Sequence, residues 1–324
     1  MSMTYSRSFA PGLTRRAALG AAFAVPAAFY GLSKYGPGLI GQAAAQAPQP
    51  APLPRSRAHT VRIGAAEVTA LLTGRVFGQD PASIFAMGVP AEEFAAVAAS
   101  HGLPTDRMVN NFVPTLIRIG EQRILIDAGL TPDGIRAALL DAEQKPEDIT
   151  HVVMTHLHGD HIGGLHDGAA VFANARLLIP KTEYDYWAGA DNAGFKGKVL
   201  PLSDRITTFD DSTGLPGGLT AVPTYGHTPG HTAYLLESQG KRLMLTGDCF
   251  NHYVFSVERP DWEVRYDMDK AAAKATRRAV LERLANERIP FIGYHMPFPA
   301  IGLIGKTTDG NYRYIPATYH LDNP

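Results

Sequence analysis

Hydrophobic and polar positions alternate along much of the chain, in short runs separated by turns that contain glycine. Alternation over residues 61–72, interrupted at Gly64, predicts a β-hairpin. Apolar positions at helical spacing over residues 133–142 predict an amphipathic helix. Apolar runs predict strands at 113–119, 124–126 and 149–154, with a turn at 120–122. Residues 81–101 are expected to form an insertion with a helical stretch at 91–99.

The second half of the chain repeats this order of strands and helices. Its longest predicted helix spans residues 269–286, with Asp269 as the N-cap, and another helix opens at 183–187. Strands are predicted at 176–179, 219–222, 232–237, 242–246, 291–293 and 311–316. Two successive sets of strands and helices predict an α/β fold in which helices pack outside a β-sandwich. Because no Gly/Ser-rich linker interrupts it, we expect residues 61–324 to form one domain.

The N-terminal segment has the pattern of a targeting sequence. Arg15 and Arg16 precede an apolar, alanine-rich run, and a stretch of small residues ends at Ala47. This resembles a twin-arginine-type signal peptide over residues 1–47, which implies the Tat export machinery as a partner and a periplasmic or secreted protein. A retained membrane anchor is the alternative, although the apolar run is short and contains Pro26. Residues 48–60 are expected to form an extended, proline-rich leader.

Charge and cysteine content narrow the function classes. The net charge is -1, and the charged residues of the first 47 positions are all basic, so the mature domain is mildly acidic. This disfavours a general nucleic-acid binder, which needs a basic surface. The single cysteine, Cys249, excludes an intramolecular disulfide, so the core and any bound metal must stabilise the exported domain. We expect Cys249 to be a buried small residue rather than a nucleophile.

The strongest chemical signal is a cluster of histidines directly after a predicted strand. It reads Thr155-His156-Leu157-His158-Gly159-Asp160-His161. Imidazole and carboxylate groups are the usual ligands of zinc and similar divalent ions. A histidine-rich surface loop without metal is the alternative, but the position after an apolar strand and before Gly163-Gly164 favours a metal site. One short loop cannot complete such a site, so further ligands must come from elsewhere.

The motif His-x-His-x-Asp-His resembles the signature of the metallo-β-lactamase superfamily. The other positions of that family occur in order: Asp127, His227, Asp248 and His295. Singly, each is better explained as a turn residue or a core histidine, but their order and placement favour metal binding. The resemblance implies a four-layer αβ/βα sandwich holding two divalent metal ions, with zinc expected. One ion would take His156, His158 and His227, and the other Asp160, His161 and His295. Asp248 would bridge the two ions, and Asp127 would orient the ligand loop from behind.

Within this superfamily the chain is most similar to the methyl parathion hydrolase-like group, which includes lactonases. The shared features are the exported N-terminus, the run from Gly226 to Ser238, His295-Met-Pro-Phe-Pro, and the Tyr-Arg-Tyr-Ile-Pro end. The similarity implies hydrolysis of a lactone, aryl ester or phosphotriester by a metal-bridging hydroxide, with Asp160 passing a proton to the leaving group. Asn251 stands where many lactonases carry tyrosine, so lactone specificity stays open, with Tyr253 as a candidate substitute.

Two other functions remain open at this stage. A glyoxalase II-like thioesterase shares the whole ligand set, and a non-catalytic exported metal-binding protein would keep the same fold. For the substrate pocket we expect Phe112, Trp187, His252 and Tyr253, while His166 and His231 are expected to be structural. No Lys/Arg cluster adjoins the ligand motifs, which predicts a neutral, partly apolar small-molecule substrate. We also consider a homodimer.

Overall fold

The computed structural model describes residues 56–210 and 213–317. The chain divides into the units Met1–Gln46 and Ala47–Pro324, so the expected signal peptide and the leader up to residue 55 lie outside the described residues. Strand β1 (Ala58–Ile63) begins inside the segment expected to be leader, because Ala58 already pairs with Leu71 of the next strand. In the described part of the chain, no helix is long and apolar enough to cross a membrane.

The first sheet has seven strands, ordered β1-β2-β5-β6-β7-β8-β9. Neighbouring strands are antiparallel from β1 to β6 and parallel from β6 to β9. After β1, its strands are β2 (Ala66–Leu71), β5 (Thr115–Ile119), β6 (Gln122–Ile126), β7 (His151–Val153), β8 (Arg176–Pro180) and β9 (Ile206–Phe209). The hairpin expected over residues 61–72 is therefore confirmed as β1 and β2.

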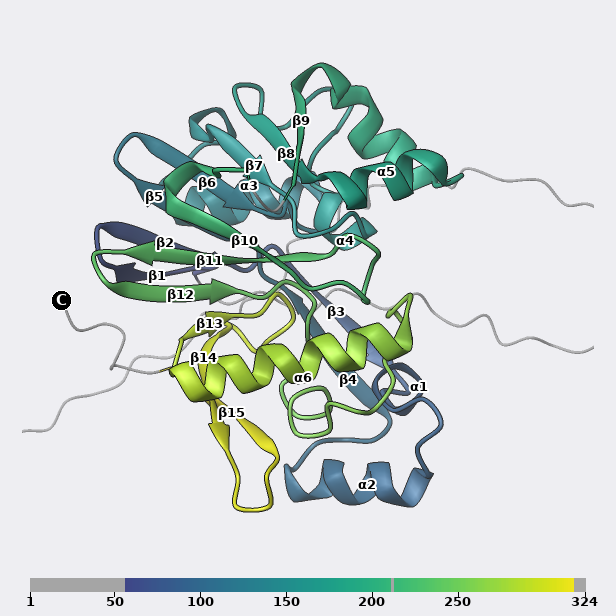
Figure 1. The fold of residues 1–324 in the computed structure, drawn as a ribbon. Helices are drawn as coiled ribbons and strands as arrows, with labels where there is room; N and C mark the ends of the chain where they lie inside the picture. The colour runs from purple at the N-terminus through teal and green to yellow at the C-terminus, as the bar shows by residue number, and fades with distance from the viewer. Residues whose placement is uncertain (1–55, 211–212, 318–324) are drawn as a thin grey trace, which may run out of the picture. The chain divides into compact units, whose positions relative to one another are not determined.

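The second sheet has six strands in chain order from β10 to β15. They are β10 (Leu219–Pro223), β11 (Thr232–Ser238), β12 (Lys241–Leu245), β13 (Phe291–Ile292), β14 (Ile301–Lys306) and β15 (Tyr312–Pro316). The β12–β13 pair is parallel and the other pairs are antiparallel. Figure 1 shows β5 to β9 of the first sheet in the upper part and β13 to β15 of the second sheet in the lower part, with β1 and β2 at the level of β10 to β12.

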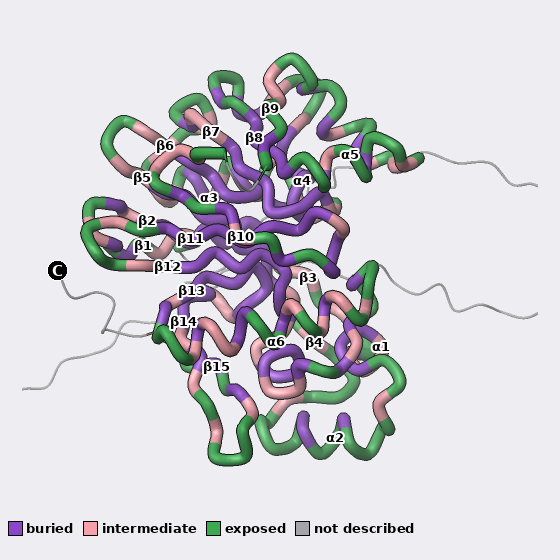
Figure 2. The backbone as a smooth tube through the Cα atoms, viewed as in Figure 1, coloured by how far each residue is buried: buried purple, intermediate pink, exposed green. Residues whose placement is uncertain are grey.

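Strand alternation assigns the side chains of the first sheet to two apolar layers. Ile124 and Ile126 enter the cluster between the sheets, where they meet residues of β11 and β12. Leu125 points the other way, into a cluster with Ile135 and Leu139 of α3 (Pro132–Asp141). Buried positions accordingly run through the middle of the described unit in Figure 2. This arrangement confirms the predicted α/β sandwich with helices outside the sheets.

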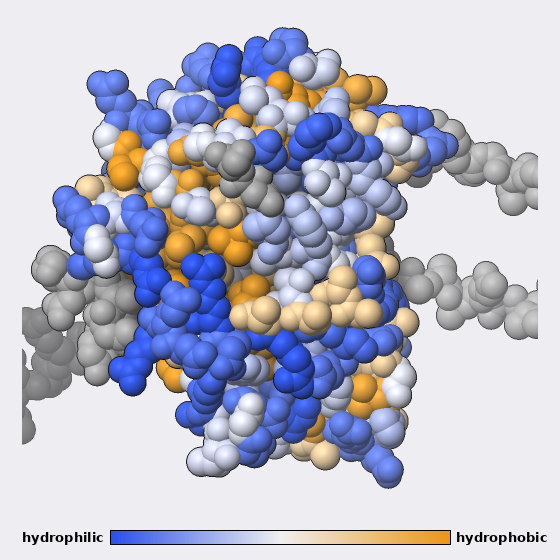
Figure 3. Space-filling view, viewed as in Figure 1, coloured by the Kyte–Doolittle hydropathy of each residue, from blue (hydrophilic) through white to orange (hydrophobic). Residues whose placement is uncertain are grey.

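The long helix α6 (Lys270–Glu287) covers the second sheet. As predicted, Asp269 is its N-cap, accepting a hydrogen bond from the backbone N–H of Ala272 at 2.9 Å. Leu281 and Leu284 join the same apolar cluster from the helix side of the second sheet, while hydrophilic side chains gather along the outer side of α6 in Figure 3. The other helices are α1 (Ala82–Phe85), α2 (Ala91–Ser100), α4 (Gly159–Ile162) and α5 (Lys181–Gly189), with short 3-10 or π turns η1 (Pro146–Asp148), η2 (Phe195–Val199), η3 (Leu200–Arg205) and η4 (Pro216–Gly218).

Several predicted boundaries shift, and some elements were missed. Gln122 belongs to β6 rather than to a turn, and β7 covers only His151–Val153 of the expected strand at residues 149–154. Strands β9 and β14 were not predicted, nor was an arm of two antiparallel strands, β3 (Gly74–Gln79) and β4 (Arg107–Phe112). Between the arm strands, α1 and α2 pack with Phe255 and Trp262 in a third apolar cluster. This addition borders the candidate site.

Candidate metal centre

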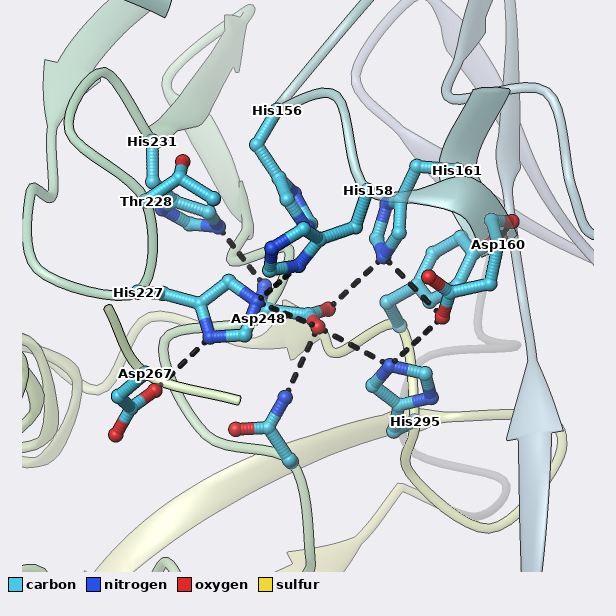
Figure 4. A network of polar contacts seen from close by, with 12 residues as sticks. His156, His158, Asp160, His161, His227, Thr228, His231, Asp248, Asp267 and His295 are labelled. Atoms are coloured by element: carbon cyan, nitrogen blue, oxygen red, sulfur yellow. Dashed lines mark hydrogen bonds and ion pairs between the residues drawn. The ribbon is translucent and has the colours of Figure 1, made fainter. Parts of the chain in front are cut away.

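The side chains of the predicted ligand set follow the ends of four strands. The loop after β7 carries His156, His158, Asp160 and His161, and the loops after β10, β12 and β13 carry His227, Asp248 and His295. β6 and β7 are parallel in the first sheet, and β12 and β13 are parallel in the second, so the carboxyl ends of each pair lie together. The contacts among the donor atoms show that both pairs end at the same edge of the sandwich. Figure 4 shows the side chains converging from both sheets around Asp248.

Their donor atoms form three overlapping groups, each with its atoms within 4.8 Å of one another. The groups are His156–His158–His227, His156–His161–Asp248 and Asp160–His161–His295. Asp248 joins the outer two groups, with its Oδ1 atom 3.2 Å from His161 Nε2 and its Oδ2 atom 3.3 Å from His227 Nε2 and 3.1 Å from His295 Nε2. The structure thus brings together all the ligands inferred from the sequence. Two of the three groups correspond to the two metal positions that the resemblance implied, and the third, with Asp248, joins them.

The donor set fits divalent cations. His156 Nε2, His161 Nε2 and Asp248 Oδ1 are buried atoms that form no hydrogen bond within the described part of the chain, although the last two lie 3.2 Å apart. A buried polar atom without a hydrogen bond lowers the stability of the fold unless a bound ion or water satisfies it. All of these atoms point into the same small space, where a cation could contact them. Imidazole nitrogens and carboxylate oxygens are ligands for zinc and related ions. The residues support a dinuclear metal site.

The electrostatics of the cluster differ from one histidine to the next. Burial lowers the pKa of His156 well below its usual value, and burial together with neighbouring His227 lowers that of His158 to about 3. Burial opposes protonation of His161 as well, but the carboxylates of Asp248 and Asp127 outweigh it and raise the pKa of His161. Because histidine binds metal only when neutral, His156 and His158 are ready to bind a cation, whereas a cation must compete with a proton at His161.

Asp127 lies behind the cluster and outside the three donor groups. Its Oδ1 accepts from the backbone N–H of Thr155 at 2.8 Å, and its Oδ2 accepts from the Thr155 hydroxyl at 2.8 Å and lies 2.9 Å from His161 Nδ1. A carboxylate on the far nitrogen of a ligating histidine fixes the ring and its tautomer. The position suits the orienting role expected for Asp127.

Other supporting residues lie far away in sequence and were not anticipated. Asp267 Oδ1 is 2.9 Å from His227 Nδ1, and its Oδ2 accepts from the fully buried Arg277 at 2.6 Å. His295 Nδ1 donates to the backbone carbonyl of Asn111 at 2.9 Å. The Asn251 amide donates to Asp248 Oδ2 at 2.9 Å, so the asparagine noted in the sequence contacts the central carboxylate. The polarity of these residues was visible, but nothing in the local sequence linked them to the cluster.

The remaining histidines and the cysteine lie outside the ligand groups. His231 Nε2 accepts from the backbone N–H of Asp248 at 3.0 Å, which places this ring against the backbone. His166 forms an isolated β-bridge with Ala170 and belongs to none of the donor groups. Cys249 is buried, and burial raises the pKa of its thiol to about 12, which suits a packing residue. These positions agree with the structural roles expected for them.

A cavity of about 520 Å³ opens over the cluster. His158, Asp160, His227, Asp248 and His295 line its floor. Its walls come from the β3–β4 arm, α1 and the loop before α6, and include Val76, Phe77, Ile84, Phe85, Met108, Phe112, Asn251 and Tyr266. No lysine or arginine is among the described lining residues. Phe112 is therefore in the cavity as expected, with its ring edge-on to His295.

Three of the expected pocket residues lie elsewhere. Trp187 is buried behind His158, where its Nε1–H donates to Glu183, because α5 starts at Lys181 and turns this face inward. His252 and Tyr253 line a separate cavity of about 320 Å³. The backbone N–H groups of Val254 and Phe255 donate to His252 Nδ1, which holds the ring away from Asp248. The tyrosine that lines the metal-side cavity is Tyr266 rather than Tyr253.

Comparison with known proteins agrees with this site. The family model described as the metallo-beta-lactamase superfamily matches residues 113–290. An N-acyl homoserine lactonase of Bacillus cereus is 34% identical over 113 residues, covering 35% of this chain and 43% of the relative. An N-acyl homoserine lactonase of a Bacillus species is 34% identical over 152 residues, covering 46% and 57%. The chain thus spans about half the length of these curated relatives.

Solved structures share the fold over most of the chain. The complex of AidC, a dizinc quorum-quenching lactonase, with a homoserine product has a TM-score of 0.73 at 24% identity, covering 81% of this chain and 98% of AidC. The hydrolase AbOPH has a TM-score of 0.76 at 24% identity, covering 82% and 99%. At this identity the likeness establishes the fold.

Proposed function

The chain belongs to the metallo-β-lactamase superfamily, and from this we propose that it is a dinuclear zinc hydrolase of neutral, partly apolar ester-like substrates. The observation that carries the proposal is the convergence of the histidine and aspartate donors at the floor of an open cavity. Two divalent ions bound there would supply an activated water and polarise the substrate's carbonyl or phosphoryl oxygen. A binding protein without activity would not need a cavity leading to its metal ligands.

The chain's own residues provide the remaining parts of the reaction. Hydrolysis adds water across the ester bond, so that the leaving oxygen gains a proton as its bond to carbon or phosphorus breaks. Asp160 lines the cavity and its side chain is 24% exposed, whereas that of Asp248 is 4% exposed. We assign Asp160 the role of carrying a proton from the attacking water to the leaving oxygen, and Asp248 that of holding both ligand groups together.

The cavity walls favour a neutral substrate with an apolar part. Phe77, Phe85, Phe112 and Met108 provide an apolar wall, and no cationic side chain lines the cavity among the described residues. An anionic group held against these walls would lose its hydration without gaining a lysine or arginine partner. The relatives named as N-acyl homoserine lactonases support lactones within this class. Aryl esters and neutral phosphotriesters have the same charge and are included in the proposal.

Two alternatives have weaker support. A glyoxalase II-like thioesterase would use the same ligands, but its glutathione thioester is anionic and would face a cavity without lysine or arginine. A non-catalytic metal-binding protein would use the ligands for stability alone. We retain the further proposals that residues 1–47 direct export to the periplasm or beyond through the twin-arginine route, and that the mature domain associates as a homodimer.

The test is a substrate panel on one zinc-loaded preparation. We expect the highest kcat/KM for medium-chain lactones or aryl esters, lower values for neutral phosphotriesters, and almost no turnover of glutathione thioesters or β-lactams. An Asp160→Asn variant, which also replaces a charged metal ligand by an amide, should lose most of its turnover even at saturating zinc, with the smallest loss for substrates whose leaving group needs no proton. A preference for the glutathione thioester would instead support a glyoxalase II-like thioesterase, and no turnover of any substrate class would support a non-catalytic metal-binding protein.

A further inference from the structure

Glu183 is a buried acid that contacts no ligand side chain, yet it lies between two ligand loops. It belongs to α5, on the outer side of the first sheet, and its exposed fraction is 0%. Its Oε1 accepts from the backbone N–H of Leu157 at 2.9 Å and from Trp187 Nε1 at 2.6 Å. Its Oε2 accepts from the Thr228 hydroxyl at 2.7 Å and from the backbone N–H of Gly230 at 2.9 Å. Both carboxylate oxygens of Glu183 thus accept hydrogen bonds and donate none.

Three of these donors, from Leu157, Thr228 and Gly230, come from the two loops that supply one of the donor groups. Leu157 lies between His156 and His158, and Thr228 directly follows His227. The first loop leaves β7 of one sheet, and the second connects β10 and β11 of the other. A single carboxylate therefore spans the two sheets at the point where the histidines of the His156–His158–His227 group must meet.

Close packing at Gly230 gives independent evidence that this junction is tightly defined. A Cβ atom at Gly230 would lie 2.1 Å from the backbone nitrogen of Glu183 and 2.6 Å from its Cα. The start of α5 thus rests directly on the second loop, with no room for a side chain. The hydrogen bonds and the packing hold the same pair of segments together.

The other buried acids near the cluster act differently. Asp127 contacts His161 and Asp267 contacts His227, so each orients one imidazole ring. Glu183 instead holds the backbone from which the imidazoles extend. We propose that Glu183 is a positioning residue that sets the spacing between the His156–His158 loop and the His227 loop, and thereby the affinity of one of the two metal positions. This inference rests on the proposed function, because it requires that the cluster bind two cations.

The variant Glu183→Gln tests the spacing with a minimal change in volume. A glutamine side chain has one accepting oxygen, so its NH₂ group must face either Leu157 and Trp187 or Thr228 and Gly230. The Thr228 hydroxyl can turn to accept, but the backbone N–H of Gly230 cannot, so one loop loses a hydrogen bond and meets an opposing donor. We expect zinc affinity at the three-histidine position to fall about 10- to 100-fold, the range found when residues supporting metal ligands are changed.

The experiment is a chelator competition with zinc on the purified chain, recording how many ions are bound and how tightly. The wild type should hold both ions, and Glu183→Gln should release one ion at chelator concentrations where the other stays bound. Asp185→Asn is the matched control, since it makes the same chemical change on the same helix at an exposed side chain. It should behave as the wild type does.

Two further variants keep the test decisive if Glu183→Gln does not fold. Thr228→Val and Trp187→Phe each remove one donor to a different Glu183 oxygen while leaving the carboxylate in place. Each should weaken the same metal position by a smaller factor. Unchanged affinity in all the variants, or equal weakening of both positions, would overturn the inference, because a merely structural residue does not select one ion. A wild-type chain that binds no zinc would instead overturn the proposed function.

Discussion

Replacing Arg277 by methionine should destabilise the protein strongly and loosen the loop behind His227. Arg277 is fully buried in α6 and donates to the backbone carbonyls of Cys249, Pro260 and Trp262, and to Asp267 Oδ2 at 2.6 Å. It therefore ties the helix to the segment that follows Asp248 and ends at the acid supporting His227. Methionine keeps much of the side-chain length but supplies no donor.

The size of the stability loss follows from the buried polar groups that Arg277→Met leaves without a partner. Asp267 would become a buried charge whose remaining partner is His227, and breaking a buried ion pair from one side costs about 3–5 kcal/mol. The carbonyls that lose a donor add about 1–3 kcal/mol each if water cannot reach them, although such costs are not additive. We therefore expect a loss of at least about 3 kcal/mol, a large part of the total stability of a typical domain.

Urea unfolding at saturating zinc measures this loss, and the neighbouring residue provides the control. Arg278 lies next to Arg277 on the same helix and pairs with Asp261, but its side chain is 48% exposed. An exposed ion pair contributes about 0–1 kcal/mol, so Arg278→Met should shift the urea midpoint only slightly. Similar losses for the two variants, or a loss below about 1 kcal/mol for Arg277→Met, would refute the reasoning from burial and hydrogen bonding.

Elemental analysis should find two divalent ions per chain, and Asp248→Ala should lose metal and activity together, because this carboxylate lies between both ligand groups; full activity with one ion or none would rule out a dinuclear mechanism. Burial, with a contribution from His101, lowers the pKa of His252 to about 3 in the folded protein, whereas histidine in an unfolded chain titrates near about 6.5. Protonation of this ring therefore favours the unfolded chain, and the protein loses stability as the pH falls from about 6.5 towards 3. Between pH 7 and pH 5, the wild type should therefore lose about 1–2 kcal/mol more in urea unfolding than His252→Asn, and equal losses would contradict this. Replacing Arg15 and Arg16 by lysine should leave the precursor in the cytoplasm on fractionation, and normal export would favour a general secretory route.

Local sequence patterns were sufficient for the elements whose side chains alternate or repeat at helical spacing. The β1–β2 hairpin, α3 and α6 were all predicted, including the Asp269 cap, because their burial follows the period of the element itself. The β3–β4 arm was missed because its residues are mostly exposed or half-buried, so no clear alternation marks them. The arm supplies a wall of the cavity, and this explains why the pocket was predicted less well than the ligands.

By itself, the sequence determined which residues form the proposed metal-binding set, because each of them belongs to a short motif at a strand end and the motifs occur in a characteristic order. Only the tertiary structure decided what surrounds that set. Glu183 lies 26 positions from Leu157 and 47 from Gly230, and Asp267 lies 40 positions from His227, separations at which no local pattern reports a contact. The same holds for Trp187, His252 and Tyr266, whose places depend on how the helices and loops pack against the sheets. Ligand identity is a property of local chemistry, whereas ligand support and pocket shape arise from packing between distant segments.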